Sequence, residues 1–335
     1  NRAFPSAPPP SRKAMPLVTI ARNAFLESIR QPIHAVLICA ALLALVLNVN
    51  LAGYTLEDDN KLLVDLGLST LFLSGLLMAA FTATSVLSRE IENKTVLTVV
   101  SKPVPRPQVV VGKFLGVAAA IATAYWLLAA VFLLTVRHRV QSSVREEDIF
   151  DPPVVTFGLL AIGLTFLIAG LANYLYRWSF PATFAIVGAV LATVAWGLVS
   201  CISRSWRLQA PGTDFDPQLA IGLTLVFEAI IVLTAIAIAA STRLGQIPTL
   251  LVCVGVFLVG LVGEYFLSLA SAGRGWLRPL AAVVPNLQFF WPADALTQGS
   301  TITLGHLGTV TAYAACLVAA AMSLAVILFQ QRDVG

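Results

Sequence analysis

SREIENKTVLTVVSKPVPRPQVVVGKFLG, residues Ser88 to Gly116, lies between two long apolar segments of the chain. It is densely charged, although only 11% of the 335 residues are charged and 58% are hydrophobic. A soluble domain has about 25% charged residues. The contrast predicts a membrane protein whose apolar spans are joined at this point by a charged loop on one membrane surface.

The apolar segments predict the fold class. Each is close to the roughly 20 residues that cross a bilayer as a helix. Eight segments qualify: residues 33–52, 64–87, 110–136, 154–176, 181–202, 218–240, 247–268 and 305–329. We therefore expect residues 16–335 to form one all-α, polytopic transmembrane bundle of about eight spans, with both termini on the same side.

Two segments precede the first span. Residues 1–15 are rich in proline, serine and basic residues, and we expect a disordered cytosolic tail. Residues 17–30, LVTIARNAFLESIR, favour an amphipathic helix along the membrane surface. Its apolar or small residues recur at helical spacing: Leu17, Ile20, Ala21, Ala24, Phe25 and Ser28. The polar residues Arg22, Glu27 and Arg30 lie elsewhere on the helix.

The distribution of lysine and arginine predicts the orientation. If the N-terminus is cytosolic, the cytosolic segments carry 13 of the 21 positive residues and four acids. The loops on the opposite side then carry 8 positive residues and 11 acids. This bias places the Ser88–Gly116 stretch and both termini in the cytosol, and the protein in the cytoplasmic (inner) membrane. The small net charge of +4 gives no reason to expect nucleic-acid binding.

No motif for catalysis or nucleotide binding is present. Gly112-Lys113 is not a phosphate-binding loop, because Pro107 stands where its first glycine should be and Phe114 where Ser or Thr should be. The cysteines and histidines are isolated, which predicts apolar filler and hydrogen-bonded interfacial side chains, not metal ligands. We expect no enzyme activity, cofactor or metal on this chain, so ATP-driven work would need a second polypeptide.

Two acids fall within predicted spans, Glu228 near the middle of 218–240 and Glu264 toward the outer end of 247–268. A carboxylate at the centre of a bilayer costs on the order of 3 kcal/mol or more, so it faces protein or water. Glu228 fits a substrate or proton path and an interhelical hydrogen bond equally well. Glu264 is easier to solvate and is the weaker candidate.

Three further features allow two interpretations each. Residues 271–303 are rich in aromatic residues and proline, which favours short interfacial helices that form either an outer gate or an aromatic belt. Gly112 with Gly116, and Gly188 with Ala192, allow either close helix packing or dimerisation. Arg89 to Val100 can form a helix that ends before Pro103, and this surface loop either receives force from a partner or is merely solvated.

REIENKTVL at 89–97, SKPVPR at 101–106 and the following Gly112-Lys113 together resemble the ABC-2 type permeases. The pattern around Arg22, Phe25, Glu27 and Arg30 is similar to the elbow helix of that family, and FQQRD at 329–333 to its F-x-x-R-D ending. The resemblance covers the first 116 residues well and the last span moderately. It is nearest to the group associated with multicopper-enzyme and nitrous-oxide-reductase maturation.

The resemblance implies a permease subunit of an ATP-driven exporter. Two permease copies, expected here as a homodimer, would form the path in the bilayer, and two separate ATPase subunits carrying ATP and Mg²⁺ would dock beneath them. The 88–109 loop would be the cytosolic coupling helix that contacts the ATPase. The implied coupling residues are Arg89, Glu90, Glu92, Lys94, Thr95, Lys102, Pro103 and Arg106.

The chain departs from this family in its number of spans, because the family has six and eight are expected here. The extra pair would be 154–176 with 181–202, and an accessory extracytoplasmic protein could dock on it. Two other functions stay open. One is a non-transporting membrane subunit that transmits motion to an extracytoplasmic partner, and the other is a proton-coupled carrier that uses Glu228. The substrate is not indicated.

Overall fold

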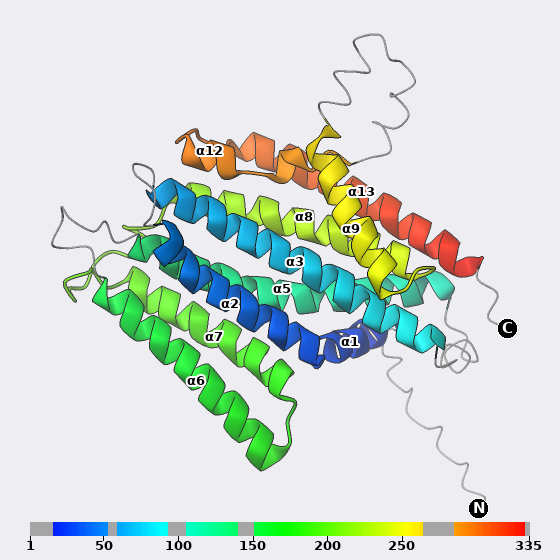
Figure 1. Ribbon diagram of the computed structural model, residues 1–335, viewed down its shortest axis with the longest axis horizontal. Coiled ribbons are helices and arrows are strands. Elements are labelled where there is room, and N and C mark those ends of the chain that lie inside the picture. Colours follow the sequence, from blue (N-terminus) through cyan, green and yellow to red (C-terminus); the bar gives the residue numbers. More distant parts are fainter. Residues whose placement is uncertain (1–15, 53–58, 93–104, 140–150, 264–284, 332–335) are drawn as a thin grey trace, which may run out of the picture.

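The computed structural model describes residues 16–52, 59–92, 105–139, 151–263 and 285–331. These residues form helices and no strand, which confirms the all-α bundle (Figure 1). The expected tail, residues 1–15, lies outside the described residues. Seven of the described helices are long and apolar enough to cross a membrane. They are α2 (Pro32–Ala52), α3 (Asp59–Glu92), α5 (Arg106–His138), α6 (Pro152–Tyr176), α7 (Phe180–Ser200), α8 (Pro217–Ser241) and α13 (Leu304–Gln330).

The predicted span 247–268 is described only in part. It is represented by α9 (Gln246–Leu261), whose 16 residues rise about 24 Å at 1.5 Å per residue, less than the roughly 30 Å of hydrocarbon. Residues 264–268 lie outside the described part. Near the end of α9 the backbone meets a returning segment, because Leu287 N donates to Gly260 O at 3.2 Å. A Cβ at Gly260 would stand 2.8 Å from Pro285 O, so only glycine allows this approach.

The aromatic segment before α13 is buried more deeply than an interfacial position requires. Of residues 271–303, the structure describes 285–303, which contain the short η2 (Gln288–Phe290) and α12 (Ala293–Thr297). Phe290 is buried and stacks on Tyr313 of α13 at 6.0 Å between ring centroids. Trp291 meets Phe72 of α3 edge to face at 5.8 Å. This part of the segment therefore packs among the spans, where its aromatic rings gain protein contacts.

Helix α5 is the centre of the bundle and packs against α1 (Pro16–Ile29) and against α2, α3, α6, α7, α8 and α13. Glycines on α3 bring its neighbours close. A Cβ at Gly67 would lie 2.1 Å from the Phe132 ring of α5, and one at Gly75 would lie 2.4 Å from Ile230 of α8. Small residues at helix interfaces are how membrane helices reach van der Waals contact.

Helices α6 and α7 form a hairpin at the edge of the bundle (Figure 1). They are the pair expected to be additional to the family's six spans. Within the hairpin, a Cβ at Gly188 of α7 would lie 3.2 Å from Leu127 of α5 and 3.3 Å from Thr165 of α6. The predicted Gly188–Ala192 pair therefore lies at a helix interface. The outward side of α6 carries large apolar side chains, as a lipid-facing helix does.

We predict that Gly67→Ala destabilises the bundle by about 1–3 kcal/mol, because the new methyl group overlaps the Phe132 ring. The measurement is the midpoint of unfolding in detergent, with Gly163→Ala as the control because nothing lies within 4 Å of a Cβ there. Trimming the ring in a Gly67→Ala, Phe132→Leu double variant should give a smaller loss than the two single losses added. Strict additivity would show that the two residues do not clash.

Candidate functional site

The Ser88–Gly116 stretch, on which the functional expectation rests, is divided between two helices. Helix α3 continues through Glu92, so the backbone of Arg89, Glu90 and Glu92 extends this span and begins no separate helix. At 34 residues α3 is roughly 50 Å long, well beyond the hydrocarbon thickness. Lys94, Thr95, Lys102 and Pro103 lie outside the described residues. Helix α5 then begins at Arg106.

The expected amphipathic helix is confirmed as α1. Its apolar and small residues form a stripe, and this stripe is the side that packs against the rest of the bundle. Ala24 and Ser28 are buried, and Ser28 Oγ donates to Ala24 O at 2.7 Å, which satisfies the hydroxyl within the helix. Arg22, Glu27 and Arg30 are exposed. The helix therefore covers apolar surface with one side and presents charges on the other.

Gly112 and Gly116 of α5 receive α1. A Cβ at Gly116 would stand 2.4 Å from Ala21 O and 2.7 Å from Phe25 N, both backbone atoms that cannot rotate away. A Cβ at Gly112 would stand 2.8 Å from the Ile20 side chain. The predicted G-x-x-x-G therefore binds the amphipathic helix of its own chain.

A buried lysine next to these glycines joins α5 to α3. Lys113 is 4% exposed, and its Nζ donates to Val86 O at 3.1 Å. A cation is favoured near the carbonyl end of a helix, and Val86 lies in the last turns of α3. Ser85 Oγ on the same turn donates to Gln31 Oε1 at 2.7 Å, between α1 and α2. These contacts hold α1, α2, α3 and α5 together at one end of the bundle.

The histidine expectation is wrong at one position. His34 at the start of α2 is fully buried, and neither ring nitrogen has a hydrogen-bond partner among the described residues. It lies inside the packed helices because α1 and α3 pack against the start of α2. His138 Nδ1 does lie 2.9 Å from Arg139 O, and His306 is exposed.

Arg106 brings the last span to the same site. Its guanidinium Nη1 donates to Gln330 O at 3.1 Å, across 224 residues of sequence. The last carbonyls of a helix have no partner within the helix, so Arg106 caps the end of α13. The end of SKPVPR thus meets the first residues of FQQRD. In Figure 1, α1 and the ends of α3, α5 and α13 that carry these contacts lie toward the same end of the bundle.

Of the two candidate intramembrane acids, only Glu228 is described. Its Oε1 accepts a hydrogen bond from Thr311 Oγ1 of α13 at 2.7 Å. Oε2 is buried and has no partner among the described residues. The interhelical hydrogen bond is therefore present. Glu264 lies outside the described part.

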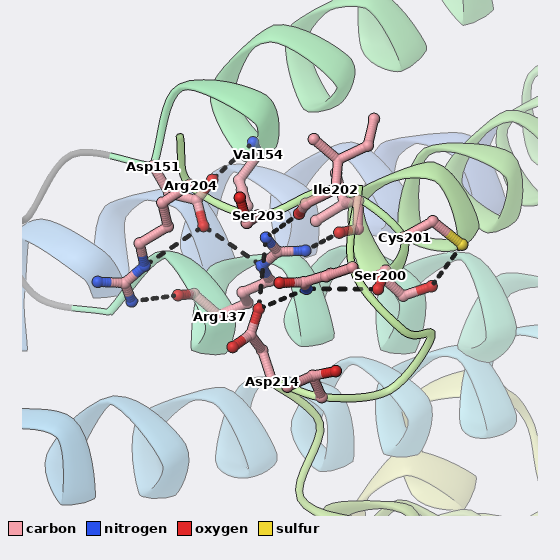
Figure 2. A network of polar contacts seen from close by, with 12 residues as sticks. Arg137, Asp151, Val154, Ser200, Cys201, Ile202, Ser203, Arg204 and Asp214 are labelled. Carbon is pink, nitrogen blue, oxygen red and sulfur yellow. Dashed lines mark hydrogen bonds and ion pairs between the residues drawn. The ribbon is translucent and has the colours of Figure 1, made fainter. Parts of the chain in front are cut away.

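A polar network at the opposite end was not anticipated as a site (Figure 2). Arg137, near the end of α5, donates to Val199 O and Ile202 O and pairs with Asp151 Oδ2 at 3.3 Å. Asp151 is fully buried, and its Oδ1 accepts from Val154 N at the start of α6. Arg204 lies 3.7 Å from the same Asp151 oxygen. The network ties α5 and α6 to the segment between α7 and α8.

The sequence contained one signal for this network. Asp151 precedes Pro152 and Pro153, a pattern typical of a helix N-cap. In the sequence alone, Arg137, Asp151 and Arg204 are loop charges that indicate only the orientation of the chain. Their burial depends on how three separate connections fold together, which no local spacing indicates.

The fold and composition define the class of protein: an all-α, multi-pass membrane protein. Within the described residues, no group of three or more His, Cys, Asp or Glu side chains could hold a metal ion. No family model matches the chain, and no curated protein sequence matches it significantly. The function is therefore argued from the geometry.

We predict that Gly116→Leu displaces α1 from α5, because the new side chain meets the α1 backbone at Ala21 and Phe25. The expected result is faster proteolysis of residues 16–30 in membranes, with the spans still protected. Gly163→Leu on α6 is the control, because a Cβ there meets nothing within 4 Å. Equal proteolysis of Gly116→Leu and the unmodified chain would contradict the assigned packing.

Proposed function

We propose that this chain is the transmembrane permease subunit of an ATP-driven exporter of ABC-2 type, driven by separate ATPase subunits at the 88–109 region. One observation carries the proposal: α1, the end of α3, the start of α5 and the end of α13 are fixed together at one end of the bundle. We call these four segments the block. The hydrogen bond from Arg106 to Gln330 O joins the last span to it. A partner that docks there acts on four helices at once.

The chemistry of the block supports a docking role. Its internal contacts use backbone carbonyls and small residues, as at Val86 and Gly116. The exposed side of α1 presents Arg22, Glu27 and Arg30. Charged side chains that are not needed for packing can form polar contacts with a soluble partner. The excess of positive residues on this side of the spans supports a cytosolic position, where ATPase subunits have access to ATP.

A second copy of the chain would cover α13. The exposed residues of α13 are mostly small or polar: Gly305, Gly308, Thr309, Thr311, Ala312, Ala315, Cys316, Ala319, Ala320 and Ser323. Membrane helices expose such residues toward other helices, whereas exposed α6 residues such as Leu159 and Leu167 suit lipid. The Glu228 carboxylate beside Thr311 is also better placed against protein than against acyl chains. We therefore propose a homodimer through α13.

One observation favours the related role of a non-transporting subunit that transmits motion outward. The Arg137–Asp151–Arg204 network fixes the far end of α5 to α6 and to the segment before α8. Motion received at the start of α5 would reach this surface, where an extracytoplasmic partner could bind. In both roles the ATPase subunits dock at the 88–109 region, which we call the docking region. The roles differ in whether a substrate crosses the membrane.

We predict that the double reversal Glu90→Lys, Glu92→Lys prevents association with the ATPase while the permease still folds, because both residues extend α3 beyond its apolar part. The measurements are co-purification of an ATP-hydrolysing partner from native membranes and the elution profile of the permease.

The matched control is Glu57→Lys, Asp58→Lys, two acids that directly precede α3 at its other end. The control should retain the partner. Retention of the partner and its activity by the Glu90, Glu92 variant would overturn the assignment of the coupling region.

We predict that Cys316 forms a cross-link between two copies in membranes, because it is an exposed free thiol on the proposed interface. A short bismaleimide should give a dimer band on denaturing gels, and Cys316→Ser should abolish it. Cys201→Ser, which removes the cysteine that follows α7, is the control and should keep the dimer band. A monomer band alone for the unmodified chain would argue against an interface on α13.

A further inference from the structure

A cavity of about 520 Å³ lies between α2, α5, α6 and α7. Its walls are predominantly apolar, with Leu127, Val131, Ile162 and Phe184 among them. None of the described residues that line it is acidic, lysine or arginine. The volume falls within the roughly 300–1,000 Å³ of pockets that hold small ligands. A predominantly apolar cavity favours an apolar ligand over water.

The cavity opens sideways between α2 and α6. Val46 of α2 and Leu159 of α6 both line it, yet they are 45% and 65% exposed. They therefore form the rim of a mouth on the outer surface of the bundle. Both belong to membrane-spanning helices, so the medium outside this mouth is the hydrocarbon of the bilayer.

Polar groups gather at one end of the cavity. Asn50 lies near the end of α2, and Thr135 and His138 lie in the last turn of α5. Deeper in the cavity the polar group is Thr165, whose hydroxyl already donates to Ala161 O at 2.6 Å. The cavity is therefore apolar along its depth and polar at the membrane surface.

We propose that this cavity binds one acyl chain of a bilayer phospholipid, with the head group at the end formed by Asn50, Thr135 and His138. The apolar walls match the hydrocarbon chain, and the lateral mouth admits it directly from the bilayer. The Asn50 amide supplies N–H donors for a phosphate oxygen. The lipid joins the α6–α7 hairpin to α2 and α5. This site is independent of the docking region and of any ATPase partner.

Two glycines on α6 provide a matched test. Gly158 lines the cavity, Gly163 is exposed and does not line it, and nothing lies within 4 Å of a Cβ at either position. Gly158→Phe therefore places a ring in the cavity, and Gly163→Phe places the same ring outside. The protein is reconstituted into nanodiscs of phosphatidylethanolamine and phosphatidylglycerol, released, and weighed by native mass spectrometry. We expect the unmodified chain and Gly163→Phe to retain one phospholipid that Gly158→Phe loses.

A second measurement does not depend on the folding of a variant. Phosphatidylglycerol with a diazirine near the end of one acyl chain is photolysed in nanodiscs that contain the unmodified protein. We expect labelled peptides to include Ile162 or Phe184 of the cavity wall, and Gly158→Phe to lose this labelling while Gly163→Phe keeps it. Equal lipid retention by the two variants, or labelling confined to outward residues such as Leu160, would overturn the proposal.

Discussion

Close backbone approach at glycine is the interaction on which this bundle depends. Membrane helices gain no hydrophobic free energy by leaving lipid for one another, so van der Waals packing and interhelical hydrogen bonds must hold them. Gly67 and Gly75 let α3 meet α5 and α8, and Gly116 lets α5 meet α1. Each of these contacts lies on α3 or α5. The two helices therefore fix the positions of most other elements.

Polar contacts then fix the two ends of the glycine-packed core, and they do so differently. At the end that holds α1, Lys113 donates to Val86 O within α3, and Arg106 donates to Gln330 O and caps α13. At the other end, Arg137 is shared between two carbonyls and the buried Asp151. Removing one partner of such a buried pair leaves an uncompensated charge, on the order of 3–5 kcal/mol. That end is consequently well suited to stay together when the helices move.

The local sequence pattern was sufficient to predict the features that repeat within one helix. The stripe of α1 follows from the 3.6-residue period, and most spans follow from hydropathy. The spacing of Gly112 and Gly116 predicted a close contact but not its partner, because the partner depends on where α1 folds. The predicted span 247–268 is described only as far as residue 263, and the contact of Gly260 with Pro285 in this part is set by a segment far along the chain.

Long-range features were inaccessible to the same reasoning. No spacing in the sequence relates Arg106 to Gln330, which lie 224 residues apart. Only the family resemblance linked the motif at 101–106 with the motif at 329–333. The cavity depends on the volumes of side chains from four helices. The sequence of a single helix such as α6 therefore indicates an apolar span and does not indicate a cavity. The unpartnered burial of His34 likewise follows from the packing of α1 and α3 around the start of α2, and a histidine at a span end reads as interfacial in the sequence.

Helix α5 gives the proposed function a physical route across the membrane. Its 33 residues run without interruption from the glycines that hold α1 to Arg137 in the polar network at the opposite end. Pro107 stands in the first turn, where proline does not kink a helix, so the helix has no hinge of that kind along its length. A displacement imposed at Gly116 therefore reaches Asp151 and the start of α6 as a movement of one rigid element.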